Sequence, residues 1–385
     1  MVARTPLSRT NRASALETSV KRELFDLPEG VIYLDGNSLG APPRHVAARM
    51  QEVVAHQWGT RLIRSWSEGW WEAPQRIGDR IGRLVGAAPG QVVVGDSTSV
   101  NVFKALMGAV KGTERGEVVV DEATFPTDGY IAESVASLTG LKVRAAHPSS
   151  LDLTGDTAVV LLNQVDYRTG ELHDMKALTE QVHAAGAQVV WDLCHSAGVL
   201  PIALDELQVD FAVGCTYKFL NGGPGSPAFI YVPHAKQATF ENPLSGWNGH
   251  REPFGMKSSY EPDPGIARAR VGTPDILSML ALDAALDVWD DVDLAELRER
   301  GLRLTAVFRE RVEELTDLEV ITPERRGNQI SVRCPDAKAV MDELIARGVI
   351  GDHRPPDVLR FGFAPLYVTD EDAVRAAEVL ADVIR

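Results

Sequence analysis

Cysteine is scarce in this 385-residue chain, which contains only Cys194, Cys215 and Cys334. Their spacing matches neither a disulfide framework nor a metal-binding motif, so we expect no structural metal and a reducing compartment. No apolar run approaches the roughly 20 residues that a membrane-spanning helix needs. The first residues also lack the apolar core of a secretory signal. These features predict a cytoplasmic protein without a membrane anchor.

Basic residues are outnumbered by acidic ones, 39 to 54, which gives a net charge of −15. This balance argues against nucleic acid or an anionic membrane surface as a partner. Aromatic residues make up only 6% of the chain, yet four of its seven tryptophans fall between Trp58 and Trp71. Such a cluster is usually part of a core or an interface, but it also suits the wall of an aromatic substrate pocket.

Strand and helix patterns alternate from about residue 90 to residue 232, which predicts βα units and a mainly parallel sheet. The strands are expected at 92–95, 117–120, 158–162, 187–191, 210–215 and 228–232, and helices at 100–110, from 125 onward and at 174–186. Upstream, we expect a loosely held arm or short helix at 1–28, a strand at 30–34 and helices at 44–58 and 74–86.

A smaller α+β unit is expected toward the C-terminus. Its predicted elements are helices from about 274, at 292–315 and at 336–347, strands near 318–321, 329–333 and 358–361, and a last helix. Length alone suggests two domains. We therefore divide the chain into an N-terminal segment (1–44), a large domain (45–273) and a small C-terminal domain (274–385).

Two consecutive predicted strands within residues 188–232 are each followed by a residue whose side chain can take part in a reaction. Asp192 follows the first, Lys218 follows the second, and a glycine-rich turn at 221–226 comes next. Ligands of open α/β sheets bind outside the carboxyl ends of the strands. Alone, Lys218 reads as a surface lysine and Asp192 as a helix cap. Together they fit pyridoxal 5′-phosphate (PLP), which needs a lysine for its aldehyde and an acid for its pyridine nitrogen.

Other segments could complete such a site. Residues 96–99, Asp-Ser-Thr-Ser, precede a helix and either bind the cofactor phosphate or simply cap the helix. Phe125 could lie on the cofactor ring with Asp128 nearby, or the two could be a core residue and a helix cap. The turn at 35–40 reads on its own as an ordinary loop. Arg360 lies in an apolar strand and is a candidate clamp for a substrate carboxylate.

With these residues in place, nearly the whole chain resembles kynureninase, a fold type I PLP enzyme of the class V aminotransferase group. The resemblance rests on these segments: Tyr33-Leu-Asp-Gly-Asn-Ser-Leu-Gly40, Leu62-Ile-Arg-Ser-Trp66, Phe125-Pro-Thr-Asp128, Trp191-Asp-Leu-Cys-His-Ser-Ala-Gly198, Cys215-Thr-Tyr-Lys-Phe-Leu-Asn-Gly-Gly-Pro-Gly225, Leu244-Ser-Gly-Trp247 and Arg360-Phe-Gly-Phe-Ala-Pro-Leu-Tyr367. It implies a large domain with a mainly parallel sheet, a small C-terminal α+β domain, and PLP-dependent hydrolysis of L-kynurenine to anthranilate and L-alanine, a step of tryptophan catabolism.

The resemblance also implies residue roles. Lys218 would carry PLP and act as the base, Tyr217 would donate a proton, and Arg360 would hold the substrate carboxylate. The remaining cofactor and substrate contacts that it implies are Asp192 and Asp128 at the pyridine nitrogen, Phe125 on the ring, Thr98, Ser99 and Tyr217 at the phosphate, His195 and Asn163 beside the cofactor, and Trp66 in the aromatic pocket. Trp247 and Thr273 would reach the site from the second subunit of a homodimer.

Three points stay open at this level. The region of Trp66 and the pair Gly272-Thr273 resemble the bacterial type of the family rather than the animal type, which implies a preference for kynurenine over 3-hydroxykynurenine, a possible second substrate. Asn248 stands where the family usually has Phe, which affects the edge of the pocket. The alternative function is that of a cysteine desulfurase or selenocysteine lyase, which needs a mobile nucleophilic cysteine. Cys334 is the C-terminal candidate, and its place before Pro335 suits that role poorly. A degenerate binding protein would be expected to lack Lys218 or Asp192.

Overall fold

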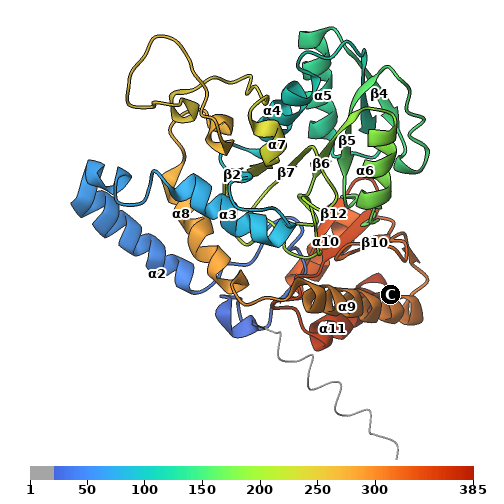
Figure 1. The fold of residues 1–385 in the computed structure, drawn as a ribbon. Helices are drawn as coiled ribbons and strands as arrows, with labels where there is room; N and C mark the ends of the chain where they lie inside the picture. Colours follow the sequence, from blue (N-terminus) through green and yellow to red (C-terminus); the bar gives the residue numbers. More distant parts are fainter. Residues whose placement is uncertain (1–20) are drawn as a thin grey trace, which may run out of the picture.

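The structure is a computed structural model that describes residues 21–385 (Figure 1). Most of the predicted N-terminal arm, residues 1–20, lies outside the described residues. Within residues 21–385, no helix combines the length and the apolarity that crossing a membrane would require.

A seven-stranded sheet forms the centre of the large unit, in the order β2-β8-β7-β6-β5-β3-β4. Its strands are β2 (Val92–Val94), β3 (Glu117–Asp121), β4 (Lys142–Ala146), β5 (Thr157–Asn163), β6 (Gln188–Asp192), β7 (Phe211–Gly214) and β8 (Phe229–Tyr231). Only β8 runs antiparallel to its neighbours. The predicted mainly parallel sheet is therefore confirmed, and β4 is a strand that the sequence analysis did not identify.

Helices cover both faces of this sheet, as its nearly continuous apolar strands require. One face packs on α4 (Thr98–Val110) and α5 (Pro126–Thr139) through a separate apolar cluster. The opposite face packs on α3 (Ala73–Val85) and α6 (Met175–Ala184). Successive strand residues alternate between the two clusters: Val189 and Trp191 belong to one, Val190 to the other. Asn163 and Asp192 are the last residues of β5 and β6, and Lys218 follows β7, so these candidate residues lie at the carboxyl ends of neighbouring strands.

The C-terminal unit is an antiparallel sheet of order β12-β13-β10-β9, covered by helices (Figure 1). Its elements are α8 (Ile276–Ala285), α9 (Leu294–Leu315), β9 (Glu319–Val320), β10 (Gln329–Arg333), α10 (Ala337–Ala346), β11 (Val349–Ile350), β12 (Asp352–Arg354), β13 (Val358–Gly362) and α11 (Asp370–Ile384). Strand β1 (Ile32–Tyr33) pairs in parallel with β11, which ties the N-terminal segment to this unit. One apolar core extends through both units, and the domain boundaries given above stay predictions.

The helix predicted at 44–58 differs in detail. The α-helix α2 (His45–Glu52) passes into a π-helix, Val53–Arg61, and then into a 3-10 turn, Leu62–Trp66. Neither segment has an apolar face against the core: α2 has no buried residue, and Val53 is the one buried residue of the π-helical segment, whereas Val54 and Trp58 are exposed. The helical prediction thus holds for 45–52, and the change to wider turns from Val53 onward has no account in the packing.

Candidate active site

The predicted lysine lies next to the predicted histidine. Lys218 follows β7, and its Nζ lies 2.9 Å from Nε2 of His195, which follows the neighbouring strand β6. Burial, and then the positive charge of Lys218, lower the pKa of His195 well below its usual range. The ring is therefore neutral, and its Nε2 can accept a hydrogen bond from the lysine. Its Nδ1 is buried and has no hydrogen-bond partner among the described residues.

Two buried acids form the floor of the same site. The Asn163 amide Nδ2 donates to Asp192 Oδ2 at 3.0 Å and to Asp128 Oδ2 at 3.2 Å. Thr124 holds the other end of this amide, donating to Asn163 Oδ1 at 2.5 Å. Burial, and then the nearby Asp192 carboxylate, raise the pKa of Asp128 well above its usual range. This buried acid pair is electrostatically suited to a cationic group such as a pyridinium nitrogen.

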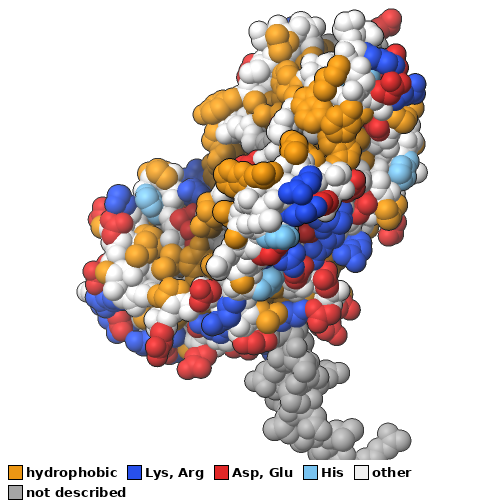
Figure 2. Space-filling view, turned by 90° about the vertical axis from the view of Figure 1, so that its left-hand side faces the viewer, with side chains coloured by type: hydrophobic (Ala, Val, Ile, Leu, Met, Phe, Trp, Pro, Cys, Tyr) orange, Lys and Arg blue, Asp and Glu red, His pale blue; other side chains and the backbone are white. Residues whose placement is uncertain are grey.

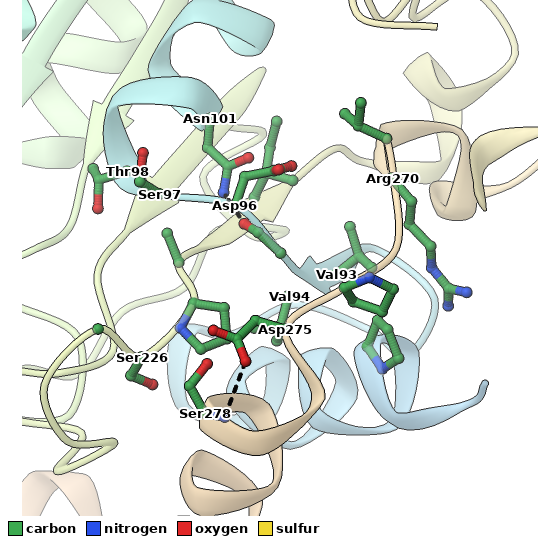
Figure 3. A pocket seen from close by; sticks show the side chains of 18 of the residues that line it. Val93, Val94, Asp96, Ser97, Thr98, Asn101, Ser226, Arg270, Asp275 and Ser278 are labelled. Atoms are coloured by element: carbon green, nitrogen blue, oxygen red, sulfur yellow. Dashed lines mark hydrogen bonds between the residues drawn. The ribbon is translucent and has the colours of Figure 1, made fainter. Parts of the chain in front are cut away.

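A cavity of about 680 Å³ opens at the start of α4 (Figure 3). Thr98 and Ser99 line it from the first turn of this helix, where unpaired backbone N–H groups favour an anion. Tyr217 and Ser226 line it from the loop that carries Lys218. In Figure 3, the residues from the start of α8 face those from α4 across the cavity. The Thr98 hydroxyl also lies 3.8 Å from Cys194 Sγ, which connects this anion site to the end of β6.

The turn at 35–40 lies between the lysine and the arginine. The Gly40 N–H donates to the Tyr217 carbonyl at 2.8 Å. A Cβ at Gly40 would stand 2.2 Å from the carbonyl oxygen of Lys218. This approach explains why glycine is needed there, and it shows that the turn is more than the ordinary loop that its sequence favoured. At its other end, Ser38 contacts Arg360.

Arg360 is 1% exposed and sits in β13 directly opposite Asp352 of β12. Its Nε donates to Asp352 Oδ1 at 2.7 Å, and its Nη2 also bonds Asp352. Nη2 donates to the Ser38 hydroxyl at 2.8 Å, and Nη1 to the Tyr167 carbonyl at 2.7 Å. Arg360 also contributes to the lowered pKa of His195, which places its charge within electrostatic range of the lysine site.

The other predicted residues divide into two groups. Phe125 is 43% exposed, contacts the Tyr167 ring in a T-shaped arrangement at 5.2 Å, and accepts a backbone hydrogen bond from Asp128 of the acid pair at 2.9 Å. Thr273 and Asn248 line the anion cavity in this chain. Trp66 instead packs edge to face on Trp70 at 5.8 Å, and Trp247 packs on Trp71 at 5.6 Å. The described structure thus groups Phe125, Thr273 and Asn248 with the site and engages the two tryptophans in other aromatic contacts.

Sequence reasoning missed several polar residues of the site. Thr124, Ser38, Tyr167 and Asp352 were not singled out, although each holds a predicted residue in place. Asp352 had a usable signal, because a charged residue stands in a short strand beside the apolar strand of Arg360. Thr124 precedes Phe125, and only the fold brings it to Asn163.

These residues fit PLP. A cofactor with an aldehyde and a basic ring nitrogen needs a lysine and an acid. Here the lysine lies beside a neutral His195 whose Nδ1 has no hydrogen-bond partner among the described residues, and the acid pair has no basic partner there. The start of α4, with its hydroxyls, suits a phosphate. Lys218 would bind the aldehyde carbon, Asp192 and Asp128 would face the ring nitrogen, and Thr98 and Ser99 would hold the phosphate.

Comparison with known proteins shows the family to which the chain is similar. The family model for the kynureninase C-terminal domain matches residues 297–380. The chain is 49% identical over 379 residues to kynureninase from Deinococcus radiodurans, covering 94% of this chain and 92% of the relative. It is 47% identical over 382 residues to kynureninase from Burkholderia pseudomallei, covering 94% and 91%.

Solved structures share the fold at low identity. A cysteine desulfurase from Thermococcus onnurineus superposes with a TM-score of 0.80 at 20% identity, covering 94% of this chain and 97% of that one. A C-DES variant with glycine covalently linked to its PLP cofactor superposes with a TM-score of 0.85 at 15% identity, covering 94% and 99%. The desulfurase alternative is thus only a distant structural relative. By its sequence and its fold, this chain belongs to the kynureninase family of PLP-dependent enzymes.

Proposed function

We infer that the chain hydrolyses L-kynurenine to anthranilate and L-alanine with PLP as cofactor. The observation that carries this inference is near-full-length similarity to kynureninases, at 49% identity, in a chain that retains a lysine, an acid pair and a buried arginine around one site. When bound, PLP withdraws electrons from the substrate's α-carbon and so stabilises negative charge beside it. The proposed roles of the protein residues follow from their surroundings.

Lys218 is proposed to move the proton at the substrate Cα. A lysine is a base only when it is neutral. Its neighbour His195 is also neutral and lies within hydrogen-bond distance, 2.9 Å, of its Nζ. The acid pair below is proposed to keep the ring nitrogen protonated, because burial and the charge of Asp192 raise the pKa of Asp128, and a positive charge beside the pair would offset the negative charge held there. These residues together set the direction of proton movement.

Tyr217 is proposed to act at the bond that breaks. Burial raises the pKa of Tyr217, so its hydroxyl keeps its proton at neutral pH. Water adds to the γ-carbonyl carbon, the Cβ–Cγ bond breaks, and its electron pair stays on Cβ. Tyr217 supplies the proton that Cβ then takes, so that Cβ becomes the methyl group of alanine. The γ-carbonyl carbon becomes the carboxylate of anthranilate, the second product.

The proposal is tested by product analysis. Purified protein with PLP and L-kynurenine should release anthranilate and alanine in a ratio of one to one. We also propose that kynurenine is preferred to 3-hydroxykynurenine, which a comparison of kcat/KM for the two compounds checks.

Three unpaired cysteines support a cytoplasmic location.

We further propose that the enzyme is a homodimer with shared active sites. The face that carries α2 and the 240–260 loop displays broad hydrophobic areas (Figure 2). Its exposed apolar side chains include Trp58, Ile63, Trp247, Phe254 and Met256. Trp247 is 38% exposed at the edge of an aromatic cluster with Trp71 and Phe254. Exposed clusters of this size are typical of a subunit interface.

Mixing two inactive variants should restore activity if the sites are shared. A Lys218→Ala chain still supplies Trp247, and a Trp247→Ala chain still supplies Lys218, so each mixed dimer regains one complete site. Random reassembly should therefore give about a quarter of the wild-type activity in the unseparated mixture and about half in purified heterodimers. Activity is measured on heterodimers separated by two different affinity tags. Verified heterodimers as inactive as either parent would contradict shared sites.

The Michaelis constant should depend on the protonation of Asp35. Burial, and then the charge of Asp352, raise the pKa of Asp35 to about 7. The other ionised members of this cluster are Asp352, Arg354 and Arg360, and Tyr33 stays neutral because its pKa is raised. Below this pH, Asp35 is neutral and the cluster has one net positive charge. Above it, ionised Asp35 cancels that charge. The KM for kynurenine should thus rise about threefold between pH 6 and pH 8.

An Asp35→Asn variant should lack this rise in KM, because its side chain cannot ionise. Asp26→Asn is the matched control, since Asp26 is an exposed carboxylate of the same segment. Steady-state KM is measured at half-unit intervals for the three proteins. A rise of the same size in Asp35→Asn would assign it to another group.

A further inference from the structure

The guanidinium of Arg360 is held by a carboxylate along one edge and only by a hydroxyl and a backbone carbonyl elsewhere. Nε and one Nη2 hydrogen point at the two oxygens of Asp352, the second Nη2 hydrogen points at Ser38 Oγ, and one Nη1 hydrogen points at the Tyr167 carbonyl. Among the described residues this leaves one Nη1 hydrogen without an acceptor. The edge formed by Nη1 and Nη2 is therefore the one that can receive a further carboxylate.

Asp352 is itself fixed from several sides. It stands directly opposite Arg360 in the β12–β13 pair, so the backbone register sets their separation. Ser38 Oγ donates to Asp352 Oδ2 at 2.5 Å, and Arg354 Nη2 donates to the same oxygen at 3.0 Å. An ion pair with this many partners is a rigid support rather than a loose surface contact.

We propose that Asp352 is the positioning residue of substrate recognition: it grips the Nε edge of Arg360 and so presents the Nη1–Nη2 edge to the substrate carboxylate. Ser38 Oγ occupies the position on Nη2 that one carboxylate oxygen takes when the substrate binds. The inference rests on the proposed role of Arg360 as the carboxylate clamp.

Two other roles for Asp352 predict the opposite effect of its removal. If Asp352 competed with the substrate for Arg360, or merely screened its charge, a neutral residue would strengthen carboxylate binding. Competition is disfavoured because Asp352 bonds the Nε–Nη2 edge, whereas the remaining contacts of Nη1 and Nη2 are with uncharged groups of Tyr167 and Ser38. Screening is disfavoured because Arg354 adds a second positive charge beside the pair. The sign of the effect therefore separates positioning from both.

The test compares two ligands of the holoenzyme that differ by a carboxylate, L-alanine and ethylamine, whose binding is followed by the absorbance of bound PLP. In Asp352→Asn, the amide NH₂ faces Nη2 and breaks the two-point contact, so the guanidinium tilts. The preference for L-alanine over ethylamine should fall about tenfold, with ethylamine affinity unchanged. The KM for kynurenine should rise by a similar factor, and kcat should change less than about threefold.

Arg360→Lys, Asp352→Glu and Asp357→Asn complete the experiment. Arg360→Lys should lose most of the L-alanine preference, and if it does not, Arg360 is not the clamp and its proposed role, on which this inference rests, is wrong. Asp352→Glu keeps the charge and should retain more of the preference than Asp352→Asn. Asp357→Asn, which removes an Arg333 partner in the same unit, should change nothing.

The outcomes that overturn the proposal are distinct from these. An unchanged or increased L-alanine preference in Asp352→Asn, alongside a lost preference in Arg360→Lys, would show that Asp352 does not orient the clamp. Failure of both Asp352 variants to bind PLP would assign Asp352 a structural role instead and would equally reject the proposal.

Discussion

Replacing Lys218 by alanine should lower kcat for kynurenine by roughly 10⁴ or more, because the same side chain is proposed to hold PLP and to move the Cα proton. The fold should survive, since the lysine side chain is only half-buried and its Nζ forms a hydrogen bond with His195. The change therefore removes chemistry without removing core packing.

Turnover is measured together with cofactor attachment. Borohydride treatment of the wild-type holoenzyme should fix the cofactor on the peptide that contains Lys218, and the variant should show no such label. Lys111→Ala is the control, because Lys111 is an exposed lysine paired with Glu241. A label on another lysine, or near-normal turnover in Lys218→Ala, would refute the assignment.

Replacing Arg360 by lysine should lower kcat/KM by roughly 10², although the charge is kept. The arginine makes four hydrogen bonds from three nitrogens, to Asp352, Ser38 and Tyr167, and an ammonium group cannot reproduce that fan of donors. PLP affinity should stay within about threefold of wild type, because the cofactor contacts lie on the other strand ends.

The control for this substitution is Arg333→Lys, in the neighbouring strand β10, where the arginine pairs with Glu319 and Asp357 away from the site. Steady-state kinetics and a PLP titration of each variant provide the comparison. Efficiency unchanged in Arg360→Lys would make Arg360 structural and leave the substrate carboxylate to another residue.

The large sheet was predictable because its strands are buried on both faces. Runs such as Val118 to Val120 and Ala158 to Leu162 contain no polar residue, so the sequence predicts them as buried strands that alternate with helices. Strand β4 escaped prediction because it is an edge strand with Lys142 and Arg144, and its burial is partial. Strands of two or three residues, such as β11 and β12, carry too little pattern to identify.

The candidate site was predictable where chemistry needs a particular residue type. Asp192 and Lys218 stand at consecutive strand ends, and the fold brings Asn163 to Asp192 and His195 to Lys218. What escaped prediction depends on contacts between distant segments. Ser38 meets Arg360 across 322 positions, and Tyr167 offers only a backbone carbonyl, which no side-chain pattern reveals.

The fold alone does not separate kynurenine hydrolysis from desulfuration, since cysteine desulfurases superpose on this chain at 20% identity or less. The thiols decide between them. Cys194 and Cys215 are buried at the strand ends, and Cys334 is 2% exposed with its Sγ near the Pro335 carbonyl. A nucleophile for sulfur transfer must be accessible, and these are not.

The most direct test of kynurenine hydrolysis is therefore the product analysis of a variant in which Cys194, Cys215 and Cys334 are all replaced by serine or alanine. Supplied with PLP and L-kynurenine, it should keep most of the wild-type activity and release anthranilate and alanine one to one. Supplied with L-cysteine, neither it nor the wild type should release sulfide efficiently. Sulfide from cysteine in the wild type, with no anthranilate from kynurenine, would contradict the assignment.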